Sequence, residues 1–248
     1  MTKPNKPQNM YDNPDFLAGY STLERFGEGW EKAGERDDLL GLLPDVTGLR
    51  VLDLGCGAGQ LSRYLAEQGA ASVVGVDLSE KMLALAREKW AHPSVTYQRD
   101  ALETAAFQPA SFDLVVSSLA FHYVEDYAAL VSRIADWLTP GGVLVYSTEH
   151  PIFTGRLPGD GWVSGDDGPR WAVDRYATEE LREENWFVDG VRKAHRTFAT
   201  FINGLVDAGL AVERVIEPVA SEQWIKDHPD WPDEWRRPTF LLVRARKS

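Results

Sequence analysis

Short apolar runs alternate with amphipathic helical patterns along most of this 248-residue chain. Residues 80–89, for example, carry Met82, Leu83 and Ala86 at helical spacing between two such runs. Parallel strands need a crossover connection, usually a helix, so the alternation predicts an α/β fold. We expect a doubly wound, mostly parallel seven-stranded sheet with helices on both faces. The expected strands are 50–54, 72–76, 95–98, 112–117, 143–148, 210–216 and 240–245, and the expected helices are 59–68, 80–89, 127–138 and 198–208.

The predicted organisation is a single domain over residues 1–248 with two additions. Residues 11–43 precede the alternation and are expected to form a helical N-terminal cap, and residues 149–193 are expected to form an inserted lid or substrate region. Residues 1–10 are polar and are expected to be a loose tail. Ligands of open α/β sheets bind beyond the carboxyl ends of the strands. We therefore expect at least two tryptophans of the long connections to belong to a lid or a pocket, out of Trp162, Trp171, Trp186, Trp224, Trp231 and Trp235.

The composition narrows the class of partner. The net charge is −12, which opposes binding to nucleic acid or to an anionic membrane surface, because such binding depends on clustered Lys and Arg. The longest stretch without a charged residue has 12 residues, short of the ~18 that a membrane span needs. Cys56 is the only cysteine and suits a reducing compartment. We expect a cytoplasmic monomer or homodimer that binds neither nucleic acid nor membrane.

A glycine-rich turn follows the first expected strand. Gly55, Gly57 and Gly59 alternate with other residues, and Asp53 precedes them by two positions. Glycine lets a ligand approach the backbone, and the helix start beyond adds free N–H donors. A dinucleotide-binding turn would place its third glycine where Gln60 stands, and no Gly-Lys-Ser/Thr follows for a phosphate loop. The turn therefore departs from both phosphate-binding patterns.

Two more acids end the next two expected strands. Asp77 lies beside the glycine turn in a βαβ unit, where its carboxylate can accept hydrogen bonds from two adjacent ribose hydroxyls. Asp100 ends the third strand and is placed to bind an exocyclic amine, and capping of the following helix is the alternative explanation. Three acids at neighbouring strand ends suit a nucleoside with a cationic tail better than a dinucleotide.

These residues resemble the class I S-adenosylmethionine-dependent methyltransferases, in the branch known as methyltransferase domain 11. The resemblance extends from about Tyr11 to the C-terminus, and its specific motifs are the glycine segment and residues 77–82, 112–118 and 138–142. It implies S-adenosylmethionine as the cofactor, S-adenosylhomocysteine as its product, and no metal ion. The cofactor-binding residues that it implies are Tyr20 (or Tyr11), Asp53, Gly55, Cys56, Gly57, Gly59, Asp77, Leu78, Met82, Asp100, Ala101, Leu102 and Ser117.

The resemblance also implies an in-line SN2 transfer of a methyl group. We expect a small-molecule acceptor, because the lid-like insertion favours an enclosed pocket, and we favour an oxygen or nitrogen nucleophile. Ser117-Ser118-Leu119-Ala120 replaces the Asp/Asn-Pro-Pro-Tyr/Phe motif of amino-type DNA methyltransferases, which opposes that activity. A general base is worth about 10²–10⁴-fold in rate. The candidate catalytic residues are His122, His150 and His195, and the candidate substrate-binding residues are Tyr123, Tyr176, Arg182, Trp186, Arg196 and Arg237.

Other interpretations of these residues stay open at this point. Each histidine can be a structural residue, and each arginine can be solvated or salt-bridged. The chain as a whole can be a regulatory protein that binds S-adenosylmethionine without catalysis. A nicotinamide-dependent oxidoreductase on a related fold is a third alternative, opposed by Gln60 and by the third acid.

Overall fold

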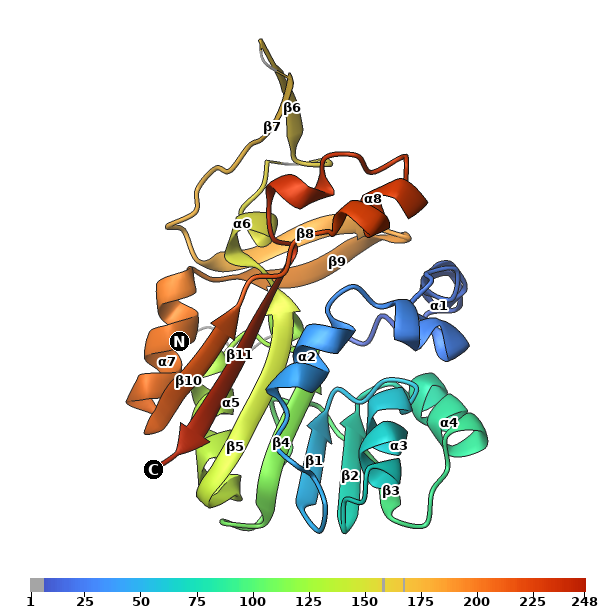
Figure 1. The fold of residues 1–248 in the computed structure, drawn as a ribbon, viewed down its shortest axis with the longest axis vertical. Helices are drawn as coiled ribbons and strands as arrows, with labels where there is room; N and C mark the ends of the chain where they lie inside the picture. Colours follow the sequence, from blue (N-terminus) through green and yellow to red (C-terminus); the bar gives the residue numbers. More distant parts are fainter. Residues whose placement is uncertain (1–6, 158, 167) are drawn as a thin grey trace.

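The computed structural model describes residues 7–157, 159–166 and 168–248, and it confirms the predicted α/β architecture (Figure 1). The central sheet has seven strands in the order β10-β11-β5-β4-β1-β2-β3. Strands β1 to β5 are mutually parallel, and β11 runs antiparallel between β5 and β10. The strands are β1 (Arg50–Leu54), β2 (Ser72–Asp77), β3 (Val95–Arg99), β4 (Phe112–Ser118), β5 (Leu138–Glu149), β10 (Leu210–Ile216) and β11 (Phe240–Lys247).

Crossover helices connect the strands and cover the sheet. Side-chain caps start several of them: Ser79 accepts the N–H of Met82 at the start of α4, and Asp126 accepts the N–H of Ala129 at the start of α5. Two buried apolar clusters form the core, one around Leu52, Phe121 and Tyr146 and another around Val51, Leu114 and Val145. The helices are α3 (Gln60–Glu67), α4 (Glu80–Lys89), α5 (Tyr127–Trp137) and α7 (Phe198–Asp207).

One boundary differs clearly from the sequence prediction. The segment Thr139 to Gly142 was expected to separate a helix from a strand, but β5 begins at Leu138 and runs through it. Gly141 takes a positive φ of 77°, which lets the chain bend there. The end of β11 holds this stretch, because Arg246 donates to the carbonyl of Gly141 and Lys247 donates to that of Leu138, both at 2.8 Å. Tertiary pairing therefore overrides a local breaker signal.

The region after β5 has its own regular structure. It contains the short helix α6 (Pro151–Thr154) and two antiparallel hairpins. The first hairpin is β6 (Trp162–Gly165) with β7 (Gly168–Trp171), and the second is β8 (Glu180–Trp186) with β9 (Val188–His195). Figure 1 shows the second hairpin lying across the carboxyl end of β5 and the first projecting away from the sheet.

The N-terminal region lies beside that same sheet edge (Figure 1). It contains α1 (Pro14–Tyr20), a 3₁₀ turn η1 (Gly27–Lys32) and α2 (Arg36–Leu42), in agreement with the partly helical cap expected there. The short segments between β4 and α5 and before β11 are η2 (Phe121–Tyr123), α8 (Glu222–Asp227) and η3 (Glu234–Arg236). In the part of the chain that is described, no helix has the length and apolar character that a membrane crossing requires.

Candidate functional site

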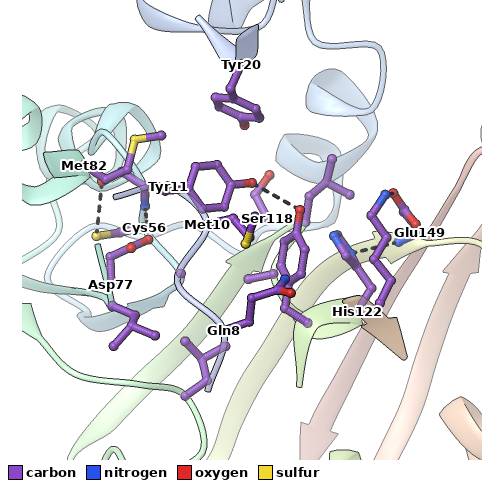
Figure 2. Close-up of a pocket in the computed structure, with 18 of the residues that line it drawn as sticks. Gln8, Met10, Tyr11, Tyr20, Cys56, Asp77, Met82, Ser118, His122 and Glu149 are labelled. Atoms are coloured by element: carbon purple, nitrogen blue, oxygen red, sulfur yellow. Dashed lines mark hydrogen bonds and ion pairs between the residues drawn. The ribbon is translucent and has the colours of Figure 1, made fainter. Parts of the chain in front are cut away.

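A cavity of about 430 Å³ lies at the carboxyl ends of β1, β2, β4 and β5. The N-terminal region and the β8–β9 hairpin enclose it from the other side. Its volume falls in the ~300–1,000 Å³ range of small-molecule sites. Figure 2 shows Asp77, Cys56 and Met82 at one end of the cavity, and His122 and Glu149 at the other. We call these ends the Asp77 half and the Glu149 half.

The glycine turn after β1 forms the floor of the Asp77 half. The N–H groups of Gly55 and Cys56 both donate to the carbonyl of Val76, at 2.8 and 2.9 Å, which ties the turn to β2. A Cβ on Gly55 would lie 2.4 Å from that of Ala120, so only glycine fits there. Gly57 lines the cavity with a φ of 53°, and nothing lies within 4 Å of the place where its Cβ would be. A ligand can therefore approach this backbone directly.

Two acids lie next to this turn, of which Asp53 is buried and Asp77 is partly buried. The carboxylate of Asp77 accepts the N–H of Gly57 at 2.9 Å and that of Ser79 at 2.8 Å, and each oxygen keeps a lone pair for a ligand hydroxyl. Asp53 accepts the hydroxyl of Ser62 at 2.6 Å. Burial raises the pKa of Asp77, and burial together with the charge of Asp77 raises the pKa of Asp53 to about 7. The two acids favour a ligand that brings hydrogen-bond donors and positive charge.

Apolar side chains complete the Asp77 half. Leu78, Met82, Ala101 and Leu102 line the cavity and supply faces on which a planar base can pack. Cys56 also lines it as a buried thiol whose pKa is raised well above its ordinary value by burial, so it stays neutral. These residues match the cofactor-binding set expected from the sequence.

Three members of that expected set do not line the cavity. Asp100 accepts the N–H of Ala101 and the hydroxyl of Thr104, both at 2.8 Å, and so it caps the following turn. Ser117 is buried and donates to the carbonyl of Leu54 at 2.7 Å, while the adjacent Ser118 reaches the cavity. Gly59 begins α3 with a φ of 90°, packed against Tyr97.

An N-terminal strap, residues 7–12, crosses the cavity (Figure 2). The Gln8 amide pairs with the backbone of Arg192 on β9, accepting its N–H at 2.9 Å and donating to its carbonyl at 3.3 Å. Asp12 accepts the hydroxyl of Ser79 at 2.7 Å. The expected loose tail is therefore wrong for residues 7–10, and residues 1–6 lie outside the described part of the chain. The strap joins the two halves of the site.

Aromatic rings surround the strap. Tyr11 packs edge-to-face with Tyr20 at a centroid distance of 5.0 Å, and its hydroxyl lies 3.3 Å from that of Tyr123. Trp186 lies edge-to-face with Tyr20 at 5.9 Å. Both Tyr20 and Tyr11 therefore line the cavity, as expected, and Tyr123 and Trp186 supply walls on the side expected for the substrate.

The Glu149 half is built around a buried ion cluster. Lys193 on β9 bonds Glu149 at 2.5 Å and Glu184 at 3.1 Å, and its ammonium lies 4.6 Å from the Trp186 ring centroid. Burial opposes the charge of Lys193, but the two carboxylates outweigh it and raise its pKa. Arg156 pairs with Glu184 at 3.0 Å. All four charged groups line the cavity.

Sequence reasoning missed this cluster, along with Gln8 and Met10. Its members lie on β5, on β8 and β9, and just after α6, separated by up to 44 residues. No local spacing links them, since their proximity depends on where the hairpin folds over the sheet. The strand Glu180–Trp186 gave no signal either, because its polar residues are consecutive rather than alternating.

His122 is the one candidate histidine in the cavity lining. Its ring is buried, and its Nδ1 accepts the N–H of Glu149 at 3.4 Å. Burial, with the charge of Lys193 adding to it, lowers the pKa of His122 well below its ordinary value. The ring is therefore neutral near pH 7.

The other two candidate histidines lie outside the cavity lining. His150 caps α6 by accepting the N–H of Ile152 and bonds Glu217 at 2.6 Å. His195 lies 2.7 Å from the Thr154 hydroxyl and 2.8 Å from the carbonyl of Tyr176. Both histidines stabilise the lid region through these bonds. Neither of them lines the cavity.

Four of the expected substrate-binding residues also lie elsewhere. Arg182 donates to the carbonyl of Thr154, and Arg196 donates to the carbonyls that precede α5. Arg237 pairs with Glu234 at 2.6 Å and stacks on the Trp171 ring. The Tyr176 hydroxyl accepts the N–H that begins α7. These contacts tie the four side chains to the surrounding fold, away from the cavity lining.

Among the described residues, only Trp186 of the six tryptophans of the long connections lines the cavity. That a second one belongs to a lid stays a prediction. Trp162 and Trp171 pack on each other with a centroid distance of 5.1 Å, and Trp231 and Trp235 are exposed. Trp30, from the N-terminal region, lines the cavity instead.

Comparison with known proteins places this arrangement in context. Residues 51–142 match a family model described as a methyltransferase domain. The crystal structure of an S-adenosylmethionine-dependent methyltransferase from Mesorhizobium loti is 44% identical and covers 88% of this chain and 99% of that one, with a TM-score of 0.81. An uncharacterized protein of Haemophilus influenzae is 35% identical over 98% of both chains. A ubiquinone biosynthesis O-methyltransferase of Idiomarina loihiensis is 37% identical over 59% of this chain and 65% of its own length.

Proposed function

Because this chain belongs to the S-adenosylmethionine-dependent methyltransferases, we propose that it methylates an oxygen or nitrogen atom of a small-molecule acceptor. S-adenosylmethionine is its cofactor, and that membership also removes the nicotinamide-dependent oxidoreductase from consideration. The observation that carries the proposal is the enclosed cavity, which joins a nucleoside-shaped half to a second, polar half under the strap and the β8–β9 hairpin.

The Asp77 half fits the cofactor. Asp77 would accept the ribose hydroxyls on its remaining lone pairs, and Leu78, Met82 and Leu102 would pack on the adenine. The open backbone at Gly57 would admit the methionine portion, and the nearby acids Asp53 and Asp77 would favour its positive charge. When bound, the cofactor supplies an activated methyl group on a sulfonium.

The protein's own contribution is to position the acceptor against the cofactor and to exclude water from the site. Aromatic rings of Tyr11, Tyr20 and Tyr123 line the passage between the two halves, and such ring faces can stabilise a cation by about 0.5–2 kcal/mol. Alignment of the acceptor with the methyl carbon and sulfur can supply roughly 7–11 kcal/mol of the barrier. The strap closes the site through Gln8 and Asp12.

A small acceptor is supported by enclosure and by charge. Residues of the strap and of the β8–β9 hairpin line the cavity opposite the sheet, which suits a small acceptor, and the net charge of −12 disfavours nucleic acid. The same acidic balance and the single buried thiol support the proposal of a cytoplasmic monomer or homodimer.

The test is a transfer assay with methyl-labelled S-adenosylmethionine. The purified protein is incubated with a bacterial extract divided into small molecules, proteins and nucleic acids. We expect label in the small-molecule fraction, and a matched Asp77→Ala protein should lose it. Label found only in protein or nucleic acid would contradict the proposal, and no transfer to any fraction would favour a non-catalytic binding protein.

A further inference from the structure

One carboxylate oxygen in the Glu149 half has no partner among the described residues. The Glu149 side chain is 10% exposed, and its Oε1 takes the bond from Lys193 at 2.5 Å. Its Oε2 is buried, forms no hydrogen bond, and belongs to a residue that lines the cavity. A buried acceptor without a donor is costly, so native proteins leave one where a ligand or water supplies the missing hydrogen bond.

The cations near this oxygen are already engaged by the protein. Lys193 bonds two carboxylates, and Arg156 donates to Glu184 and to the carbonyl of Phe153, each at 3.0 Å. The two cations and the two acids Glu149 and Glu184 balance in charge. An acceptor carboxylate would compete with these acids for the cations and would leave the free oxygen without a donor.

His122 offers a hydrogen-bond donor, whereas the free oxygen of Glu149 is an acceptor. Its Nδ1 accepts the backbone N–H of Glu149, so in the neutral ring the proton sits on Nε2. Among the described residues, no protein group bonds to Nε2. The ring therefore presents a hydrogen-bond donor to the cavity, which makes it a poor base in this arrangement.

A hydroxyl matches this pair of groups. It donates one hydrogen bond and has two lone pairs, so it can donate to Glu149, accept from His122 and still attack with its second lone pair. A neutral amine has a single lone pair and cannot both accept and attack, and an ammonium has none. The walls beside the pair are the rings of Tyr123, Phe153 and Trp186, which suit a planar group.

From this geometry we propose that the methyl acceptor is an aromatic hydroxyl compound whose O–H is bound by Glu149 Oε2 and whose oxygen accepts from His122. The inference rests on the proposed function and specifies its acceptor. The acceptor oxygen forms a bond to the methyl carbon as the methyl–sulfur bond breaks. The sulfur keeps that bond's electron pair, leaving as S-adenosylhomocysteine, and the hydroxyl proton moves to Glu149. The products are an aryl methyl ether and a proton that Glu149 returns to solvent.

The experiment measures binding, so it needs no knowledge of the natural acceptor. The protein is saturated with S-adenosylhomocysteine and titrated calorimetrically with 4-nitrophenol, 4-nitroaniline and 4-nitrobenzoate. The titrations are run at pH 6, where 4-nitrophenol keeps its O–H. We expect the phenol to bind tightest, and Glu149→Gln to weaken its binding by roughly 10- to 150-fold, the scale of a hydrogen bond to a charged group. Glu183→Gln, at an exposed position of β8 outside the cavity lining, should change nothing.

Two results would overturn the inference. One is binding of the aniline or the benzoate as tight as that of the phenol, or no binding of any of the three. The other is unchanged phenol binding in a Glu149→Gln protein that still binds S-adenosylhomocysteine. If that variant does not fold, His122→Asn decides, with an expected loss of roughly 2- to 12-fold. Small-molecule labelling in the transfer assay is a separate result, so failure here leaves the proposed function standing.

Discussion

In the Asp77 half, the groups that face the cavity come from consecutive strand–turn–helix units, and much of the surface is backbone. In the Glu149 half, they come from charged side chains on β5, β8 and β9 that meet across a hairpin. The first half uses glycine, short loops and two acids, so its geometry follows from the connection of β1 to β2. The Glu149 half depends on four charged side chains that neutralise each other where little water reaches them. A substitution in the Asp77 half should therefore have a local effect, whereas a substitution in the Glu149 half should disturb the whole ion cluster.

Removal of the central cation is the strongest test of that difference. Lys193→Met should lower the free energy of unfolding by about 3–5 kcal/mol, because Glu149 and Glu184 would lose a buried partner. Urea denaturation measures it. Lys226→Met, an exposed position on α8, is the control and should change stability little. A loss under 1 kcal/mol would show that water reaches the cluster and that the two halves do not differ in this way.

The ligand contact of the Asp77 half is the next test. Asp77→Ala should weaken S-adenosylhomocysteine binding by about 1.5–3 kcal/mol, the worth of hydrogen bonds to a charged group. Isothermal titration gives the affinity, with exposed Asp207→Asn as the control. Equal affinity in the Ala variant would mean that Asp77 only orders the turn through Gly57 and Ser79.

Asp53, in the Asp77 half, should make the free energy of unfolding depend on pH. Its pKa is raised to about 7 by burial, so between its unfolded value near 4 and pH 7 the folded protein holds more protons than the unfolded chain. Its contribution to stability is therefore full at low pH and falls as pH rises, by at most about 1.4 kcal/mol per pH unit. Asp53→Asn should remove this slope in denaturation series from pH 5 to 7. A variant with the wild-type slope would refute the assignment.

A substitution in the strap that joins the two halves should have the smallest effect on ligand binding. Tyr11→Phe removes one hydroxyl pair at 3.3 Å with Tyr123, worth about 0.5–1.5 kcal/mol. S-adenosylhomocysteine should bind a few-fold more weakly, as titration can measure, while the melting temperature stays close to that of the wild type. Tighter binding in the variant would mean that the strap hinders entry more than it helps closure.

The seven-stranded fold was readable from the sequence because each unit is local. The helix over Glu80–Lys89 has its apolar spacing and its Ser79 cap within eleven residues. The Asp77 half followed for the same reason, since parallel strands bring their carboxyl ends to one edge. Asp100 and Ser117 were harder, because an acid or serine at a strand end can cap a turn as readily as it can bind a ligand. The histidines were ambiguous in the same way.

What the amino-acid sequence determined by itself is the sheet, its connections and the turn at Gly55 to Gly59, because these depend on periodicity and on backbone conformations that few residues tolerate. What only the tertiary structure decided is which polar groups face the cavity. The ion cluster of Glu149, Glu184 and Lys193, the structural roles of the buried His150 and His195, and the docking of Gln8 on β9 all depend on how distant segments pack. Charge pairing acts through space over a few ångströms, and no spacing along the chain records it.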